Sequence, residues 1–415
     1  MASPPKRATV ASLKKVSAEN LARLGIERLA EIVMAAAETR PDLKRRLRME
    51  LAAEQGAEHL VLEIDRRLAS LSASRSKVSW RKRASFVGDL DTLRTLIAER
   101  LAMLDPGLAL DRLWSFMDLA RCLGVRVKDR DGALADVFLR TASDIGTLAS
   151  ARADSGATDA LIHAIGQNPA AWIEWLPWVV ERAPQAFVVS ALARLQIAGG
   201  DSPGLAGALR ILADAADDVA AYRQTYSQAA LRTPAVAARV AQRLLAAGKV
   251  EAAGQLLTAA RPGSAPDTDW ESAWIDYLDQ SGQGAAAQQA RWAAFERTLS
   301  VERARSFVQR LSGFDDVEAE TRAREYAACC PDLALGLRFL MEWPALPDAA
   351  AMIATRDEEI AVTPEEAELW AGRLRARQPE AAHRLLRKAA AAAFRRREFS
   401  VCDRLTQEAE TIEIP

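Results

Sequence analysis

The stretch VAARVAQRLLAAGKVEAAGQLLTAARPGSAPDTDWESAWIDYLDQSGQGAAAQQARWAAFE, residues 236–296, decides the fold. It holds two helix-turn-helix segments that follow each other at an offset of 34 residues. The residues that match across this offset are Val240 with Trp274, Leu244 with Leu278, Gly248 with Gly282, Ala253 with Ala287, and Ala260 with Ala294. This offset is the period of tetratricopeptide repeats. The stretch therefore predicts stacked helical hairpins.

Each matched position has a physical role in such a hairpin. Large apolar residues one turn apart build the inner face of the first helix. Gly248 and Gly282 can adopt the left-handed conformation that ends that helix. Small alanines let the second helix pack closely against the first. The match is imperfect, because Leu257 is answered by Arg291.

The whole chain has the composition of an all-helical protein. Of its 415 residues, 50% are hydrophobic and only 6% are aromatic, and strand-favouring runs are almost absent. We predict an all-α fold with a disordered basic tail at residues 1–16, an N-terminal helical domain at 17–150 and a tetratricopeptide-like α-solenoid at 155–415. A hinge is expected at 150–157, and a loop at 124–132, which is polar and bounded by glycine.

Prolines mark the helix starts of the predicted solenoid. The starts expected from an X-Pro pair are those at Pro169, Pro184, Pro234, Pro331, Pro364 and Pro379. Capping boxes are expected where Thr363 precedes Glu366 and where Thr268 precedes Glu271. With no strand pattern between them, these signals favour hairpins of about 30–40 residues.

Charge is distributed unevenly along the chain. Residues 1–100 carry 20 Lys and Arg against 13 Asp and Glu, whereas the remainder carries 35 against 43. The basic first quarter can meet an acidic partner, nucleic acid or the acidic remainder of the chain. The four cysteines show no framework spacing, which indicates buried thiols in a reducing compartment. With neither a signal peptide nor a membrane span in the sequence, we expect a cytoplasmic protein that does not contact a membrane.

The segment SASRSKVSWRKR, residues 72–83, is the one local feature that suggests a binding site. Its candidate binding residues are Arg75, Lys77, Trp80, Arg81, Lys82 and Arg83. The cations could neutralise phosphates while the indole ring stacks on a base. They could also dock an acidic protein. In a purely structural interpretation, Trp80 packs down and the cations pair with local acids such as Asp89 and Asp91.

Three tryptophans follow at helical spacing, Trp172, Trp175 and Trp178. A face made of indole rings could hold a peptide or an aromatic ligand. The alternative, which we favour, is that they fill a core junction, because exposed indole rings are uncommon. The pattern alone leaves open whether this face is core or interface.

No catalytic, cofactor or metal motif emerges from the sequence. The three histidines lie far apart, and Glu380 with His383 forms a single E-x-x-H where a di-iron bundle needs two. Ser202 lies in a glycine-bounded loop that no predicted strand precedes, unlike a nucleophile elbow. Gly248-Lys249 is followed by valine and not by Ser or Thr, so it is no phosphate loop. We therefore expect no catalytic residue, no cofactor and no metal.

Residues 17–150 resemble the N-terminal part of an uncharacterised bacterial family, a domain of unknown function. The blocks that carry the resemblance are AENLARLGIERLA (18–30), KRRLRMELAA (44–53), SRSKVSWRK (74–82), DPGLALDRLW (105–114) and DGALADVF (131–138). Lys77 departs from the aromatic or apolar residue that the family pattern has at its place. Beyond this third of the chain the similarity is weaker and concentrates in 364–412. The family implies no activity.

These observations predict a non-enzymatic scaffold or adaptor. We expect its solenoid groove, within residues 236–296, to bind a peptide or helix of another protein. This expectation comes from fold-level analogy. The alternative is a nucleic-acid-associated factor that uses the basic cluster at residues 75–83. The sequence predicts neither the identity of the partner nor an oligomeric state.

Overall fold

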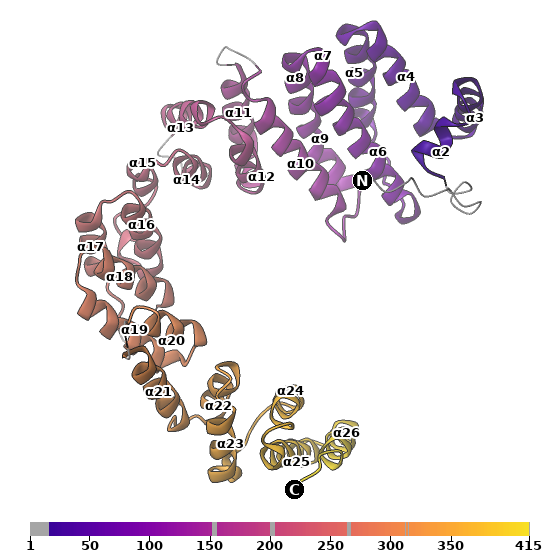
Figure 1. Cartoon of the computed structure of the whole chain (residues 1–415). Coiled ribbons are helices and arrows are strands. Elements are labelled where there is room, and N and C mark those ends of the chain that lie inside the picture. Colours follow the sequence, from indigo (N-terminus) through magenta and orange to yellow (C-terminus); the bar gives the residue numbers. More distant parts are fainter. Residues whose placement is uncertain are drawn as a thin grey trace, which may run out of the picture. The chain divides into compact units, whose positions relative to one another are not determined.

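The computed structural model describes residues 16–151, 156–199, 204–263, 267–311, 313 and 315–414. Every regular element in these residues is helical, and no strand occurs among them. The all-α prediction is therefore confirmed. The chain divides into two compact units, residues 1–226 and 227–415, whose helices are labelled in Figure 1.

The first unit is built of short and medium-length helices. Their bounds are α2 Ala18–Ala22, α3 Ile26–Thr39, α4 Pro41–Gln55, α5 Ala57–Ala73, α6 Trp80–Thr95, the π-helical η1 Leu96–Leu101, α7 Ala102–Leu104, α8 Pro106–Met117, α9 Leu119–Arg126, α10 Ala133–Leu148, α11 Gly156–Gln167, α12 Pro169–Arg182, α13 Gln185–Gly199, α14 Ala206–Ala215 and α15 Val219–Gln224.

The second unit continues in the same style. Its elements are η2 Ala230–Arg232, α16 Pro234–Ala246, α17 Val250–Ala259, α18 Thr268–Gln280, α19 Gly284–Thr298, α20 Val301–Val308, α21 Asp315–Ala328, α22 Leu333–Glu342, α23 Leu346–Thr355, η3 Asp357–Glu359, α24 Pro364–Leu374, α25 Pro379–Arg395 and α26 Phe399–Glu410.

The repeat within residues 236–296 is visible in the helix bounds. Both α16 and α18, and α17 and α19, begin 34 residues apart. Gly248 and Gly282 end the first helix of each pair with φ of 70° and 78°, the left-handed conformation expected of them. Ala253 and Ala287 are fully buried where the second helices pack. Two consecutive hairpins therefore share one local geometry.

Arg291 occupies the place that Leu257 has in the first hairpin. It is only 3% exposed. Its guanidinium forms an ion pair with Asp279 and donates a hydrogen bond of 3.0 Å to Gln288 Oε1. The long aliphatic stem fills apolar space while the charged end is paired at the boundary of the core. The mismatch in the repeat is thus a buried ion pair in place of a leucine.

Substituting Asp279 with asparagine is expected to destabilise the second unit by about 2 kcal/mol, because it leaves the charge of Arg291 buried and uncompensated. The substitution Arg291→Leu restores the residue of the first hairpin and removes that charge, so it should cost less than about 1 kcal/mol. Urea unfolding of both variants measures the difference. Equal losses of unfolding free energy in the two variants would show that leaving Arg291 unpaired costs no more than removing its charge.

Helices α10 and α12 pack against each other across the predicted hinge. The contact is close, since a Cβ on Gly146 would lie 3.0 Å from the carbonyl carbon of Val179. Residues 152–155 of the hinge lie outside the described residues, but both flanking helices belong to one compact unit. The observed division falls at residue 226 and does not test the predicted domain boundaries at residues 150 and 155, which stay a prediction.

Two local predictions were wrong. The predicted loop at 124–132 begins later, because α9 continues to Arg126. The expected capping box at Thr268 does not form, since Asp267 is the N-cap and its Oδ1 accepts from the amide of Trp270 at 2.8 Å. The box between Thr363 and Glu366 is confirmed, with both of its hydrogen bonds present.

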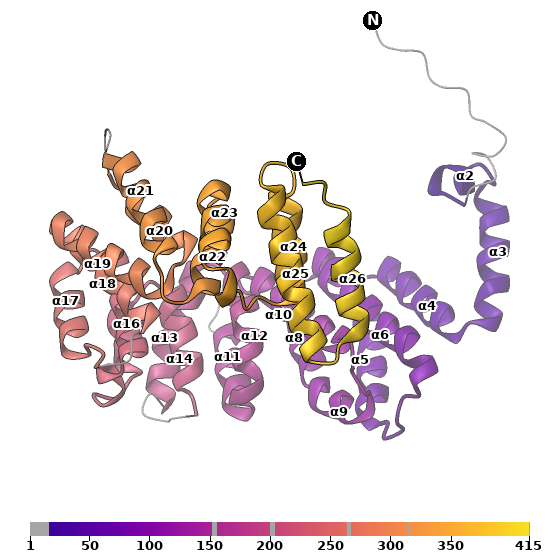
Figure 2. The ribbon, with the colours of Figure 1, turned by 90° about the horizontal axis from the view of Figure 1, so that it is seen from below.

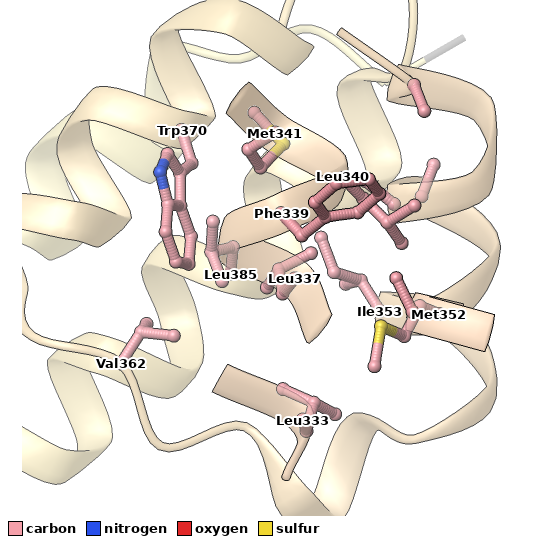
Figure 3. Close-up of a cluster of buried hydrophobic side chains, with 14 of the residues drawn as sticks. Leu333, Leu337, Phe339, Leu340, Met341, Met352, Ile353, Val362, Trp370 and Leu385 are labelled. Carbon is pink, nitrogen blue, oxygen red and sulfur yellow. The ribbon is translucent and has the colours of Figure 1, made fainter. Parts of the chain in front are cut away.

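Helices α19 to α26 of the second unit share one apolar core. Figure 3 shows Trp370 and Leu385 facing Leu337 and Met341, so that α24 and α25 close over α22. The last three helices, α24 to α26, lie side by side in Figures 1 and 2. This packing holds the helices in fixed positions, so the outer surface that they form has a defined shape.

Of the remaining predictions, some agree with the structure, one does not, and others fall outside the described residues. Cys330 is buried as expected, but Cys329 is exposed. Residues 1–15 of the basic tail predicted at 1–16 and the loop around Ser202 lie outside the described residues. Among the helices that the structure describes, none combines the length and apolar character that crossing a membrane requires.

Candidate functional site

Trp80 begins α6 and is 80% exposed. Residues 74–79 lead into it from the end of α5 without regular structure. The structural interpretation, in which Trp80 packs down onto the core, is therefore wrong. Such exposure is unusual for an indole ring, which normally loses contact with water on folding.

The cations around Trp80 also lack the partners that this interpretation gave them. Asp89 pairs with Arg45 and Arg67, and Asp91 pairs with Arg94 and Arg140 instead. The residues Arg75, Lys77, Arg81 and Lys82 are exposed and form no ion pair with any described residue. The Arg81 guanidinium carbon lies 5.3 Å from the centre of the Trp80 ring. The four cations therefore remain available to another molecule.

Arg83 differs from the other five predicted residues. It pairs with Asp131 at 2.7 Å and donates to the carbonyl oxygen of Lys128 at 3.1 Å. This contact joins the start of α6 to residues 127–132, which the sequence predicts as part of a loop but does not connect with the cluster. The loop adds exposed Lys128 and Arg130 beside the cluster.

The two segments meet where Arg83 contacts Lys128 and Asp131, and their exposed side chains are together named the Trp80 patch. It consists of Arg75, Lys77, Trp80, Arg81, Lys82, Val125, Lys128 and Arg130. Val125 is 78% exposed and adds a second apolar side chain. The sequence did not indicate that the segment around Val125 lies beside the cluster, because some 45 residues separate the two. The charged residues of this segment were nevertheless visible in the sequence.

Arg126 fixes the conformation of the segment before Trp80. It is buried, and it donates from Nη1 to the carbonyl oxygen of Leu71 at 2.7 Å. It also donates from Nη2 to Ser74 Oγ at 3.0 Å and from Nε to the carbonyl oxygen of Ser76 at 3.0 Å. The backbone amide of Val78 in turn donates to the carbonyl oxygen of Arg126 at 3.0 Å. One buried side chain thus holds a loop that would otherwise be free to move.

The first turn of α6 carries cations where the helix dipole disfavours them. Arg81 and Lys82 lie in this turn, which contains no acidic residue, and the Ser79 side chain makes no capping hydrogen bond. Positive charge at a helix N-terminus is unfavourable, whereas an anion there is favoured by the dipole and the free amides. The electrostatics of the patch therefore suit a bound carboxylate or phosphate.

The predicted tryptophan face divides into two parts. Trp172 is buried and Trp175 is half-buried, whereas Trp178 is 42% exposed. The ring of Trp172 lies 5.5 Å from that of Trp175 and 5.7 Å from that of Trp114 on α8. These three indoles line a cleft of about 630 Å³, with polar side chains of α9 and α11. The face is therefore partly core and partly the wall of a cleft.

A smaller cleft of about 330 Å³ lies within the predicted groove of the second unit. Trp270 and Trp274 stack there with their ring centres 5.3 Å apart, and Arg261 and Arg297 line its polar side. The indole N–H of Trp270 donates to the carbonyl oxygen of Leu257 at 3.0 Å, which fixes this ring. No described residue of the first unit lines this cleft.

The part of the chain that the structure describes holds no candidate metal site. No group of three or more His, Cys, Asp or Glu side chains is placed there to hold a metal ion. The absence of catalytic, cofactor and metal sites stays a prediction for the whole chain.

A family model matches the chain. The model of a family described as "Family of unknown function (DUF6880)" matches residues 11–168 and 202–410. The match spans nearly the whole chain, so the expected limit of the resemblance to the N-terminal third was wrong. Most of the tetratricopeptide-like region predicted at 155–415 therefore belongs to the same family pattern, which covers residues 202–410 of it. No curated protein matches the sequence.

Proposed function

The chain belongs to the family of unknown function DUF6880, and we propose that it is a non-enzymatic scaffold that binds an acidic segment of another protein through the Trp80 patch. The observation that carries this proposal is the 80% exposure of Trp80 beside Arg75, Lys77, Arg81 and Lys82, which form no ion pair with a described residue. Burying one such ring against a partner is worth about 3 kcal/mol. Tryptophan and arginine are also the residues that most often dominate binding at protein interfaces.

Preorganisation supports the same proposal. Because Arg126 already holds residues 71–78 through four hydrogen bonds, binding does not have to order this loop. Ordering interface segments is one of the main free-energy costs of association. A fixed loop that presents an exposed indole ring is thus suited to recognition.

A protein partner accounts for the charges better than a nucleic acid does. Residues 1–226 carry 31 Lys and Arg against 28 Asp and Glu, so the unit around the patch is only slightly basic. Nucleic-acid-binding domains are usually strongly basic over a whole face. Val125 also offers an aliphatic contact in the patch, which suits a protein side chain.

Nucleic acid is the second candidate, and one observation favours it. The exposed Trp80 ring could stack on a base while Arg75, Lys77 and Lys82 neutralise phosphates. Binding would then fall steeply with salt, with a slope set by the number of phosphates contacted.

The second unit would serve as a further contact surface. We propose that the hairpins from residue 155 onward form a tetratricopeptide-like solenoid, supported by the offset of 34 residues between α16–α17 and α18–α19. The cleft at Trp270 and Trp274 is then the position for a partner peptide in the groove. We place the protein in the cytoplasm, as its unpatterned cysteines suggest.

Reversing the charge of Arg81 and Lys82 with glutamate tests the proposal. The double variant is expected to bind its partner at least tenfold more weakly, because two attractive charges become repulsive. Arg384→Glu with Arg387→Glu is the matched control, since both residues are exposed on α25 of the other unit. The measurement is quantitative co-purification of partners with the tagged full chain, with and without nuclease.

The outcomes separate the candidates. A protein that is retained after nuclease treatment, and lost only in the Arg81–Lys82 variant, supports the scaffold. Loss of every partner with nuclease supports the nucleic-acid candidate. Equal retention by both double variants would overturn the role of the patch.

A further inference from the structure

The tryptophan-lined cleft of the first unit has the size and lining of a small-molecule site. Its volume of about 630 Å³ falls in the range usual for ligand pockets. Four helices contribute to it, and all belong to one compact unit. The indoles of Trp114, Trp172 and Trp175 form an apolar wall, and the amides of Gln167 and Asn168 line it from α11 and the start of α12.

Two opposite charges line the same cleft without pairing. Asp118 follows α8 and Arg121 lies one turn later in α9, and both are exposed along the edge that faces water. Neither side chain forms an ion pair or hydrogen bond with a described residue. This is unusual in a unit where most neighbouring acids are paired, as Asp65 is with Arg112 and Asp89 is with Arg67.

The carboxylate of Asp118 has no cation paired with it among the described residues, although His163 is nearby. Partial burial raises the pKa of Asp118, and His163 acts in the opposite direction. A raised pKa means that folding disfavours the charged form of the carboxyl group. A bound ammonium group would remove this penalty.

We propose that the cleft binds a free α-amino acid with a large apolar side chain. Its ammonium group pairs with Asp118, its carboxylate pairs with Arg121, and its side chain lies against the indoles of Trp114 and Trp175. The two charged groups of an amino acid are joined through one carbon, so they can lie between side chains that are one helical turn apart. A zwitterion also satisfies both unpaired charges at once, which a simple amine or a simple acid does not.

The experiment is calorimetric titration of the full chain with L-phenylalanine, with phenethylamine and N-acetyl-phenylalanine as singly charged analogues. Phenylalanine is expected to bind at least tenfold more tightly than either analogue, because each lost charged hydrogen bond is worth about a factor of ten or more. Glycine, which lacks the apolar part, should not bind measurably. The site lies outside the Trp80 patch, so this result is independent of the proposed function.

Variants locate the site. Asp118→Asn, Arg121→Met and Trp175→Leu are each expected to weaken phenylalanine binding at least tenfold. The controls Glu174→Gln and Trp178→Leu change matched residue types on α12 that do not line the cleft, and should bind as the unchanged chain does. Asp118→Asn should melt no lower than the unchanged chain, which separates lost binding from lost folding.

Three results would overturn the proposal. One is the failure of phenylalanine, leucine and tryptophan to bind. A second is binding of phenethylamine that equals that of phenylalanine, which would indicate a site for simple cations. The third is unchanged binding in Asp118→Asn and Arg121→Met.

Discussion

The substitution Arg126→Met is expected to abolish partner binding by the Trp80 patch while leaving every exposed residue of that patch in place. Methionine keeps much of the apolar stem but removes the three hydrogen bonds to Leu71, Ser74 and Ser76. The loop before α6 then has several conformations, and binding must pay the entropy of selecting one. The first unit should also lose about 2–4 kcal/mol of stability, because the buried carbonyl oxygen of Leu71 and two partly buried acceptors are left without their donor.

The control for this prediction is Arg126→Lys. Lysine keeps the charge but cannot reproduce a planar fork that reaches three acceptors at once. If geometry matters, the lysine variant binds almost as poorly as the methionine variant. If only charge matters, lysine restores binding. Chemical denaturation at the concentrations used for binding must show that both variants are folded.

A second large effect is expected at Gly146, where α10 and α12 approach each other most closely. In Gly146→Ala the new methyl group would overlap the carbonyl oxygen of Val179 and lie 3.1 Å from Cβ of Arg182. The backbone of α12 cannot move away cheaply, because Trp172 and Leu176 anchor it in the core. We expect a loss of about 3 kcal/mol, or a fall in melting temperature of roughly 10 °C.

Gly88→Ala in α6 is the matched control. A Cβ on Gly88 meets nothing within 4 Å, so alanine should stabilise this helix by up to about 1 kcal/mol through its higher helix propensity. Calorimetry on both variants measures the two effects. Similar melting temperatures for both would mean that α10 and α12 are separable, as a hinge at residues 150–157 would require.

The helices could be predicted from the sequence because their signals are local. Gly248 and Gly282 end their helices as expected, and Thr363 caps α24 with both bonds of its capping box. Asp267 and Thr268 are adjacent, and either could cap α18. The sequence predicted Thr268, whereas Asp267 is the N-cap in the structure. Local patterns therefore give element type well and the terminal residue less well.

The candidate site was only half accessible to sequence reasoning. The cluster at residues 75–83 was visible in the sequence. Whether its cations are paired depends on which arginines the fold brings to Asp89 and Asp91, and these are Arg45 and Arg94 among others. The role of Arg126 and the addition of Val125 and Lys128 depend on contacts between segments some 45–55 residues apart. No local pattern encodes such contacts. The cleft at Trp114 escaped detection for the same reason, because α8 and α12 meet only in the fold.

The most direct test of the central claim is photo-crosslinking from position 80. A photoreactive phenylalanine analogue replaces Trp80 in the full chain, expressed in cells of the source organism, and the same analogue at Trp178 is the control. The account predicts a crosslinked protein from position 80 that is absent from position 178, with the adduct on an acidic segment. Equal adducts from both positions, or none from position 80, would contradict the claim that the Trp80 patch is the contact surface.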